Sequence, residues 1–267
     1  MKTQNCQNCK KDFEITQEDF NFYQKIKVPP PTFCPRCRSV RRMATANERV
    51  LYKRKCDLTG KDIFSMFRED ALFPVYETSK WYSDEWNPYQ YAMDYDFSRP
   101  FFEQFKELQN KVPRMSLVRQ GFSTNSEYTN RVTDMKDSYM IFRATRSQDS
   151  MYTYNARDII NCVDCFNVYS CELCYEDIDC YKCYKTNYSQ ECTECRDCMF
   201  LYACKNCSNC VGCVNLVNQE YCIWNVKYSK EEYEKKVKEM GLNTAFGLSK
   251  MEKDFDIFRK KFPQRSR

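Results

Sequence analysis

The cysteines of the C-terminal half are spaced in multiples of three, and this spacing limits the fold more than any other feature. All fourteen cysteines from Cys162 to Cys222 share one register of period three. An α-helix repeats every 3.6 residues and a strand every two, so neither element produces this pattern. The pattern predicts a narrow β-solenoid in which every third side chain points toward a thin axis. Upstream the register holds small or apolar residues: Ser123, Ser126, Thr129, Val132, Met135, Ser138, Ile141, Ala144, Ser147, Ser150, Thr153, Ala156 and Ile159.

A coarser repeat lies on top of this period. An Asp or Gly precedes an inward residue at steps of 12, 15, 15, 18 and 15, namely at Asp137, Asp149, Asp164, Asp179, Asp197 and Gly212. From these steps we predict six or seven coils, with an aliphatic column inside and an aromatic ladder outside. The pattern is similar to that of insect antifreeze β-helices, which also place Cys, Ser and Ala inward. Their flat Thr ladder is absent here, so the resemblance implies the fold and not ice binding.

The solenoid thiols admit three interpretations. Packing is favoured, because Cys behaves as a small apolar residue and because Ser, Thr, Ala and Val fill the same register elsewhere. Disulfides across the axis and bound metal or iron–sulfur clusters are the alternatives. The N-terminus is polar without an apolar signal segment, and no run of about 18 apolar residues is present. We therefore expect a cytoplasmic protein without membrane segments, where thiols stay reduced or bind metal.

Four cysteines near the N-terminus have the spacing of a metal site. Cys6 and Cys9 form one C-x-x-C knuckle, and Cys34 and Cys37 form a second one after an insert of 24 residues. Two such knuckles offer four thiolates to one ion, which is the closed tetrahedral form of a structural zinc site. We predict one structural zinc here.

A basic segment follows the second knuckle. It contains one acid, Glu48, and eight cations: Arg36, Arg38, Arg41, Arg42, Arg49, Lys53, Arg54 and Lys55. A basic helix beside a zinc knuckle suits contacts to nucleic-acid phosphates. The alternative interpretation is a solvated charged surface or a set of partners for acids elsewhere in the chain.

The middle of the chain contains what we interpret as a second ribbon that has lost its ligands. Cys56 holds the first ligand position, while Thr59, Glu77 and Lys80 stand where the other three cysteines belong. We expect no metal there. A helix beginning near Pro100 is predicted to pack its Phe side chains against the solenoid.

Two resemblances extend this interpretation. Residues 4–40, with C-x-x-C, Phe13, the Phe22–Tyr23 pair and C-P-R-C-R, resemble the probable zinc-ribbon family, which implies generic zinc binding. The stretches Asn47–Asp57, Asp96–Phe105, Asn125–Asn130 and Tyr228–Tyr233, together with the cysteine repeats, resemble uncharacterised zinc-ribbon, cysteine-rich repeat proteins of candidate-phyla bacteria. That resemblance implies no known activity.

Two absences bear on catalysis. The chain has no histidine, which removes the usual general base and every His-ligated metal site, and its five glycines form no phosphate-binding loop. An enzyme using a groove carboxylate such as Asp164 or Asp179 is a third alternative, although turn roles explain these residues better. We therefore predict a non-catalytic zinc-binding scaffold that contacts RNA, DNA or a ribonucleoprotein, with room for a protein partner on the solenoid. The alternative function is thiol-based metal storage or redox buffering.

The predicted architecture is mostly β with small α parts, in four segments. Residues 1–45 form the zinc ribbon with its basic helix, and residues 46–120 form an α/β segment with the degenerate ribbon and an amphipathic helix. Residues 121–226 form the tight solenoid. Residues 227–267 form a helical cap that begins with the capping box Ser229–Glu232.

Overall fold

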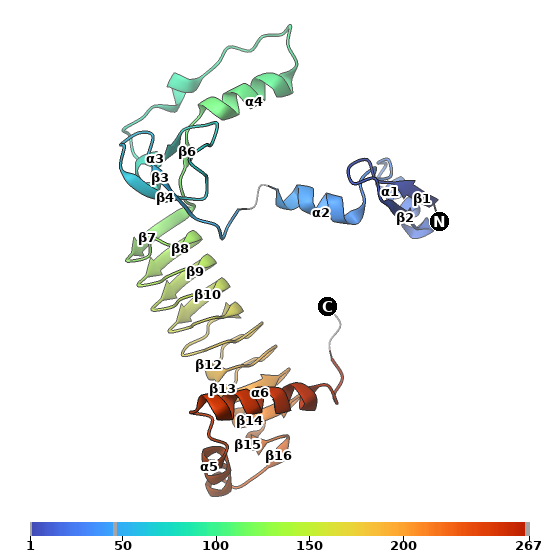
Figure 1. Cartoon of the computed structure of the whole chain (residues 1–267), viewed down its shortest axis with the longest axis vertical. Coiled ribbons are helices and arrows are strands. Elements are labelled where there is room, and N and C mark those ends of the chain that lie inside the picture. Colours follow the sequence, from blue (N-terminus) through green and yellow to red (C-terminus); the bar gives the residue numbers. More distant parts are fainter. Residues whose placement is uncertain (1, 45–46, 265–267) are drawn as a thin grey trace. The chain divides into compact units, whose positions relative to one another are not determined.

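The structure is a computed structural model that describes residues 2–44 and 47–264. The chain divides into two compact units, Met1–Val50 and Leu51–Arg267 (Figure 1). The boundary predicted at residues 45 and 46 lies outside the described residues. The fold is mostly β, as predicted, with a cysteine cluster on a hairpin, a mixed middle segment, a solenoid and C-terminal helices.

The first unit is a small ribbon followed by two helices. Strands β1 (Lys2–Asn5) and β2 (Asp12–Ile15) pair in an antiparallel hairpin. Helix α1 (Gln17–Lys25) begins at the Thr16 capping box, and α2 (Pro35–Met43) begins directly after Cys34. Among the described residues of this unit only three cysteines and Ile15 are buried, so the ribbon has almost no apolar core.

The second unit begins with another ribbon-like segment. Its hairpin precedes a short strand, a helical turn and a loop that leads into an eleven-residue helix. The Phe side chains of that helix were expected to pack on the solenoid, but Phe101 and Phe105 are 54% and 44% exposed, so this prediction is wrong. Gln104 holds the preceding loop instead, since its amide bonds the backbone of Asp96. The elements are β3 (Tyr52–Lys55), β4 (Asp62–Ser65), β5 (Val75–Tyr76), α3 (Thr78–Trp81), η1 (Pro88–Tyr91), α4 (Phe101–Lys111) and β6 (Arg114–Met115).

The solenoid consists of about nine stacked coils. Its strands pair in parallel, and bridges such as Tyr139–Met151 and Met151–Val163 join residues twelve apart. The strands are β7 (Arg119–Thr124), β8 (Asn130–Lys136), β9 (Phe142–Gln148), β10 (Tyr154–Ile160), β11 (Phe166–Tyr169), β12 (Tyr184–Asn187), β13 (Arg196–Tyr202), β14 (Ser208–Val214), β15 (Glu220–Ile223) and β16 (Val226–Lys227).

The three-residue period has a backbone cause. Every third residue from Arg131 to Trp224 has a φ between +47° and +66°, and the residue after it points inward. Each left-handed residue turns the chain at a corner, and four three-residue sides close a coil. Apart from Gly, Asn and Asp tolerate this conformation best, which explains their recurrence at the corners.

This geometry corrects the predicted number of coils. From β8 onward the coils are twelve residues long, not twelve to eighteen, whereas Arg119 in β7 pairs with Val132, thirteen residues farther on. A step of fifteen residues, as from Asp164 to Asp179, is one full coil plus one three-residue side. It therefore ends one corner farther around the following coil and does not join equivalent positions. Both aspartates are corner residues with a φ of +55°, in keeping with the turn role expected for them.

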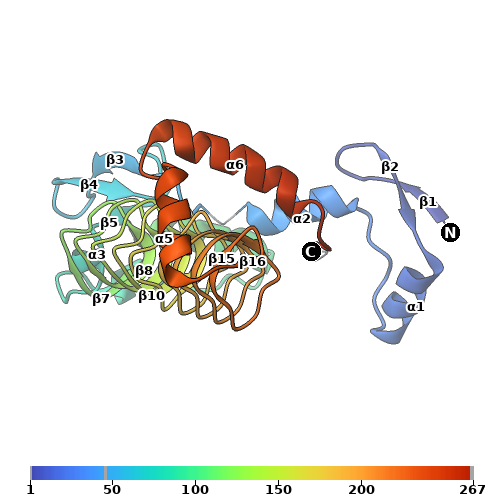
Figure 2. The same ribbon diagram turned by 90° about the horizontal axis from the view of Figure 1, so that it is seen from below.

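Two helices close the C-terminal end of the stack. Helix α5 (Lys230–Glu239) begins at the predicted Ser229 capping box. Helix α6 (Ala245–Arg259) lies across the last coils, and Met251 and Phe255 are buried there (Figure 2). Within the described parts of the chain, no helix is both long and apolar enough to cross a membrane.

Candidate metal centre

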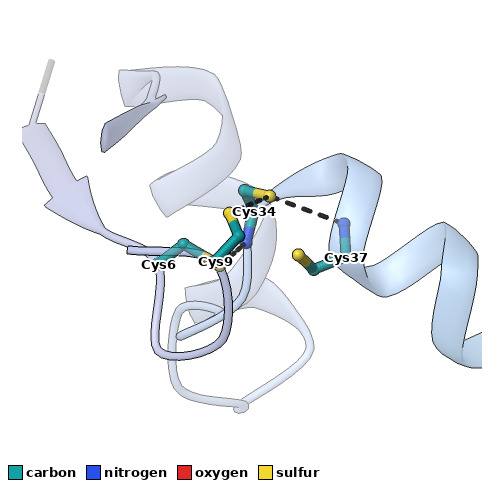
Figure 3. Close-up of side chains that lie close together, drawn as sticks. All are labelled: Cys6, Cys9, Cys34 and Cys37. Carbon is teal, nitrogen blue, oxygen red and sulfur yellow. Dashed lines mark hydrogen bonds between the residues drawn. The ribbon is translucent and has the colours of Figure 1, made fainter. Parts of the chain in front are cut away.

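The sulfur atoms of Cys6, Cys9, Cys34 and Cys37 converge in the first unit (Figure 3). All four lie within 4.8 Å of one another, and the Cys9 and Cys34 sulfurs are 3.8 Å apart. Three of the side chains are buried and Cys9 is exposed. The structure thus brings together the four residues that the spacing predicted.

Local turns present these sulfurs to one point. The hairpin turn after β1 closes with Lys10 in a left-handed conformation, and the Lys10 N–H donates to the Cys6 carbonyl. The second pair is set by a helix start: Cys34 is the N-cap of α2, and Pro35 occupies its first turn. The Cys34 N–H then donates to the Cys6 sulfur at 3.2 Å, which joins the two knuckles.

Backbone and side-chain donors favour a charged sulfur at one position. Burial opposes ionisation of Cys6, but N–H groups of Cys34, Cys9 and Asn8 outweigh it and lower the pKa of the Cys6 thiol to about 6. The Asn8 amide donates to the Cys37 sulfur at 3.4 Å. Even so, hydrogen bonding among the neighbouring thiols and burial raise the pKa of Cys37 to about 11. We did not predict the contact between Asn8 and Cys37 from the sequence, although the position of Asn8 between Cys6 and Cys9 favours it.

The donor set defines what the centre can do. Four sulfur ligands at this spacing can hold one metal ion and leave no open position for a substrate. Among residues 2–44 and 47–264, this is the one group of three or more His, Cys, Asp or Glu side chains that could hold a metal ion.

The second ribbon repeats this backbone without the ligands. Asn5 pairs with Asp12 in the first hairpin, and Lys55 pairs with Asp62 in the second, an offset of fifty residues. The Glu77 N–H donates to the Cys56 sulfur at 3.2 Å, as the Cys34 N–H does to Cys6.

Further main-chain bonds extend this match. The Asp57 N–H donates to the Val75 carbonyl, and the Gln7 N–H donates to the Thr32 carbonyl. By this backbone match, Thr59, Glu77 and Lys80 occupy the positions that Cys9, Cys34 and Cys37 have in the first ribbon.

The basic residues fall into two groups. Arg36, Arg38, Arg41 and Arg42 lie on α2 in the first unit, and Arg49 follows it as an exposed residue outside the helix. Arg36, Arg41 and Arg42 are exposed, and the Arg41 guanidinium lies 4.7 Å from the Phe33 ring centre. Arg38 is half-buried and donates to the Tyr23 hydroxyl.

The remaining predicted cations belong to the second unit. Lys53, Arg54 and Lys55 lie on β3, and Lys55 pairs with Asp62 at 3.1 Å. Arg54 is only 6% exposed: it pairs with Asp57 at 2.8 Å and donates to the Arg68 carbonyl. The expectation that Arg54 faces an external partner is therefore corrected, because its guanidinium is used within the second ribbon.

The solenoid thiols are hydrogen-bonded inside the coils. Cys162 donates to the carbonyls of Ile160 and Cys171, both at 3.4 Å, and this arrangement recurs along the stack. Hydrogen bonding with Cys165 and burial raise the pKa of Cys162 to about 12. All fourteen are buried and free of disulfides, which favours the packing interpretation.

Fold and site together define a ribbon protein with a four-cysteine centre joined to a thiol-cored β-solenoid. The chain matches no protein-family model and no curated protein.

Proposed function

We propose that the protein is a non-catalytic scaffold in which one structural zinc holds a basic ribbon that contacts RNA, DNA or a ribonucleoprotein. Zinc is the ion that best suits four thiolates in a closed tetrahedron. The first unit buries little besides the cysteine cluster, so the metal supplies the folding free energy that an apolar core would otherwise give.

The distribution of charge is the observation that supports a nucleic-acid partner. Residues 1–50 hold ten Lys and Arg against five Asp and Glu. Residues 51–267 hold 32 of each sign, so the first unit accounts for the net charge of +5 of the whole chain. Arg36, Arg41 and Arg42 are exposed on a helix that the metal centre anchors, which suits contacts to phosphates.

Thiol-based metal storage has no comparable support. The solenoid thiols already donate to backbone carbonyls, and within the described parts of the chain they form no group that could hold a metal ion. We therefore propose packing as the role of these thiols and binding as the role of the ribbon.

The test measures binding of the full zinc-loaded chain to labelled RNA and DNA, single-stranded and duplex, across a salt series. The variant Arg36→Ala/Arg41→Ala/Arg42→Ala should bind at least about tenfold more weakly. The slope of its plot of log affinity against log salt concentration should be smaller in magnitude by about two to three. The matched control removes three exposed lysines of α5, Lys230, Lys235 and Lys238, and should leave both quantities unchanged. Equal losses in the two variants, or none in the first, would refute the proposal.

A further inference from the structure

The solenoid has an apolar face that a helix covers at only one end. Over the last coils, Phe200, Tyr202, Val211, Val214 and Trp224 pack against Met251, Phe255 and Phe258 of α6. The equivalent outward positions continue at intervals of twelve residues toward the N-terminus of the solenoid. We call this continuation the aromatic face; it consists of Tyr139, Met151, Tyr152, Val163, Phe166, Tyr175 and Ile178.

The aromatic face is continuous with the covered part. Tyr175 contacts Tyr188 with ring centres 5.3 Å apart, and Tyr188 stacks on Phe200 at 4.8 Å, beneath α6. Farther along, Tyr139 contacts Tyr152 at 5.7 Å. An apolar surface therefore extends from the helix contact across the middle coils.

Most side chains of the aromatic face are exposed to solvent. Tyr152 is 52% exposed and Phe166 is 46% exposed, and Tyr139, Met151 and Ile178 are exposed as well. Contiguous apolar patches of this kind on a soluble surface mark sites of association.

The uncovered part has room for one helix. It extends over the four coils that contain Tyr139, Met151, Val163 and Tyr175, which at about 4.8 Å per coil gives a width of roughly 14 Å. A helix with its side chains is about 10 Å wide, and packed helices lie about 8–10 Å apart. A groove of ≈ 310 Å³, lined partly by Ile178, Tyr188 and Phe255, already runs along the edge of α6 that faces this space.

The charges around the aromatic face are mainly acidic. Asp164 and Glu176 lie within it as exposed side chains. Glu252 and Asp256 line the neighbouring edge of α6, and the one cation of that groove, Arg259, pairs with Asp256 at 2.8 Å. A partner with lysines or arginines beside its apolar stripe would complement this surface.

We propose that the aromatic face docks one basic amphipathic helix of a partner protein, which lies beside α6 and completes the helical layer that α6 begins. Its apolar stripe packs on Met151, Tyr152 and Phe166, and its cations face Asp164 and Glu176. The mode is that of a helix seated in an apolar groove. The docking is independent of the nucleic-acid role, because it uses a different unit of the chain.

The test uses two labelled peptides and the full zinc-loaded protein, without nucleic acid. Both peptides are about 18 residues long, five helical turns, with the same leucine stripe. One carries lysines on its polar side and the other carries glutamates. Fluorescence anisotropy should show one lysine peptide bound per chain, and the glutamate peptide should bind at least about tenfold more weakly.

Three double variants locate the site. Met151→Ser/Phe166→Ser should weaken the lysine peptide by at least about tenfold, because it removes the apolar contact. Asp164→Asn/Glu176→Gln should weaken it by about three- to tenfold, because it removes the charge complement. The matched control Glu172→Gln/Glu220→Gln changes exposed carboxylates on another side of the coil and should leave affinity unchanged. All altered side chains are exposed, and unchanged melting temperatures would confirm that the variants fold.

Other results would overturn the proposal. Equal binding of the two peptides would show that the face does not select cations, and unchanged affinity in the first two variants would place the peptide elsewhere. If the wild-type protein sediments as a dimer that Met151→Ser/Phe166→Ser dissociates, a second copy occupies the face and the partner helix does not.

Discussion

Asp177 places a carboxyl group inside the thiol-lined core, where the inward register holds thiols, hydroxyls or apolar side chains at almost every other position. Its side chain is fully buried; the Ser189 N–H donates to Oδ1 at 3.0 Å, while Oδ2 has no hydrogen-bond partner. Burial raises the pKa of the Asp177 carboxyl well above its ordinary value, and the Ser189 bond opposes this only in part. The groups that face it include the thiols of Cys183 and Cys192.

This carboxyl makes stability depend on pH in a defined direction. The folded state holds the proton to a higher pH than the unfolded state, whose carboxyl ionises near about pH 3.9. Above that value the folded state binds more protons, so stability falls as pH rises until the folded carboxyl ionises.

We expect Asp177→Asn to remove this dependence while its amide oxygen still accepts from Ser189. The free energy of unfolding of the variant, relative to the wild type, should rise by about 1.4 kcal/mol per pH unit within the window. Urea unfolding of both proteins from about pH 5 to 8 measures the difference. Asp179→Asn, at a corner outside the core, is the control and should show almost no slope. Parallel curves for Asp177→Asn and the wild type would mean that the carboxyl is not held protonated.

The second ribbon has the backbone of the first ribbon but lacks three of its four cysteines, so another interaction must stabilise it. Cys56, Ser65, Val75 and Tyr76 are buried, and Thr78 donates to the Leu117 carbonyl at 2.6 Å at the start of the solenoid. Packing on the solenoid thus supplies the stability that the first ribbon lacks without a metal. Lys80 pairs with Glu85 where the fourth cysteine would lie.

The preserved backbone predicts that the lost site can be rebuilt. The variant Thr59→Cys/Glu77→Cys/Lys80→Cys would place four thiols around the point that Cys56 already faces. We expect the zinc content to increase by one ion per chain, measured by elemental analysis after exhaustive dialysis. Adding Cys56→Ser to this variant should abolish most of the gain. A folded triple variant with the metal content of the wild type would show that the two ribbons are not equivalent.

The sequence predicted the elements whose signals are local. The register of period three identified the inward residues, and the spacing of Cys6, Cys9, Cys34 and Cys37 identified the four thiols that could hold a metal ion. The number of coils was wrong, because corner residues look alike on all four sides of a coil. The burial of Arg54 also escaped prediction, since it depends on its pairing with Asp57 in a folded turn.

The cysteines of the two units have different surroundings. The reactivity of the nineteen thiols therefore reports on the folding of each unit separately. The first unit gathers four thiols that could hold one metal ion, whereas the second packs its thiols against backbone carbonyls in a closed stack. Removing the metal should therefore unfold the ribbon and leave the solenoid intact.

A thiol reagent combined with a chelator tests this separation. We expect one zinc per chain and no fast-reacting solenoid thiol in the native protein. Chelation should release four reactive thiols, those of Cys6, Cys9, Cys34 and Cys37. The other fifteen should react only with cooperative unfolding of the second unit, because all are buried. The variant Cys37→Ser should lack the zinc and show three early thiols with an unchanged late phase. Several metal ions per chain, or solenoid thiols in the early phase, would instead favour the thiol-storage function.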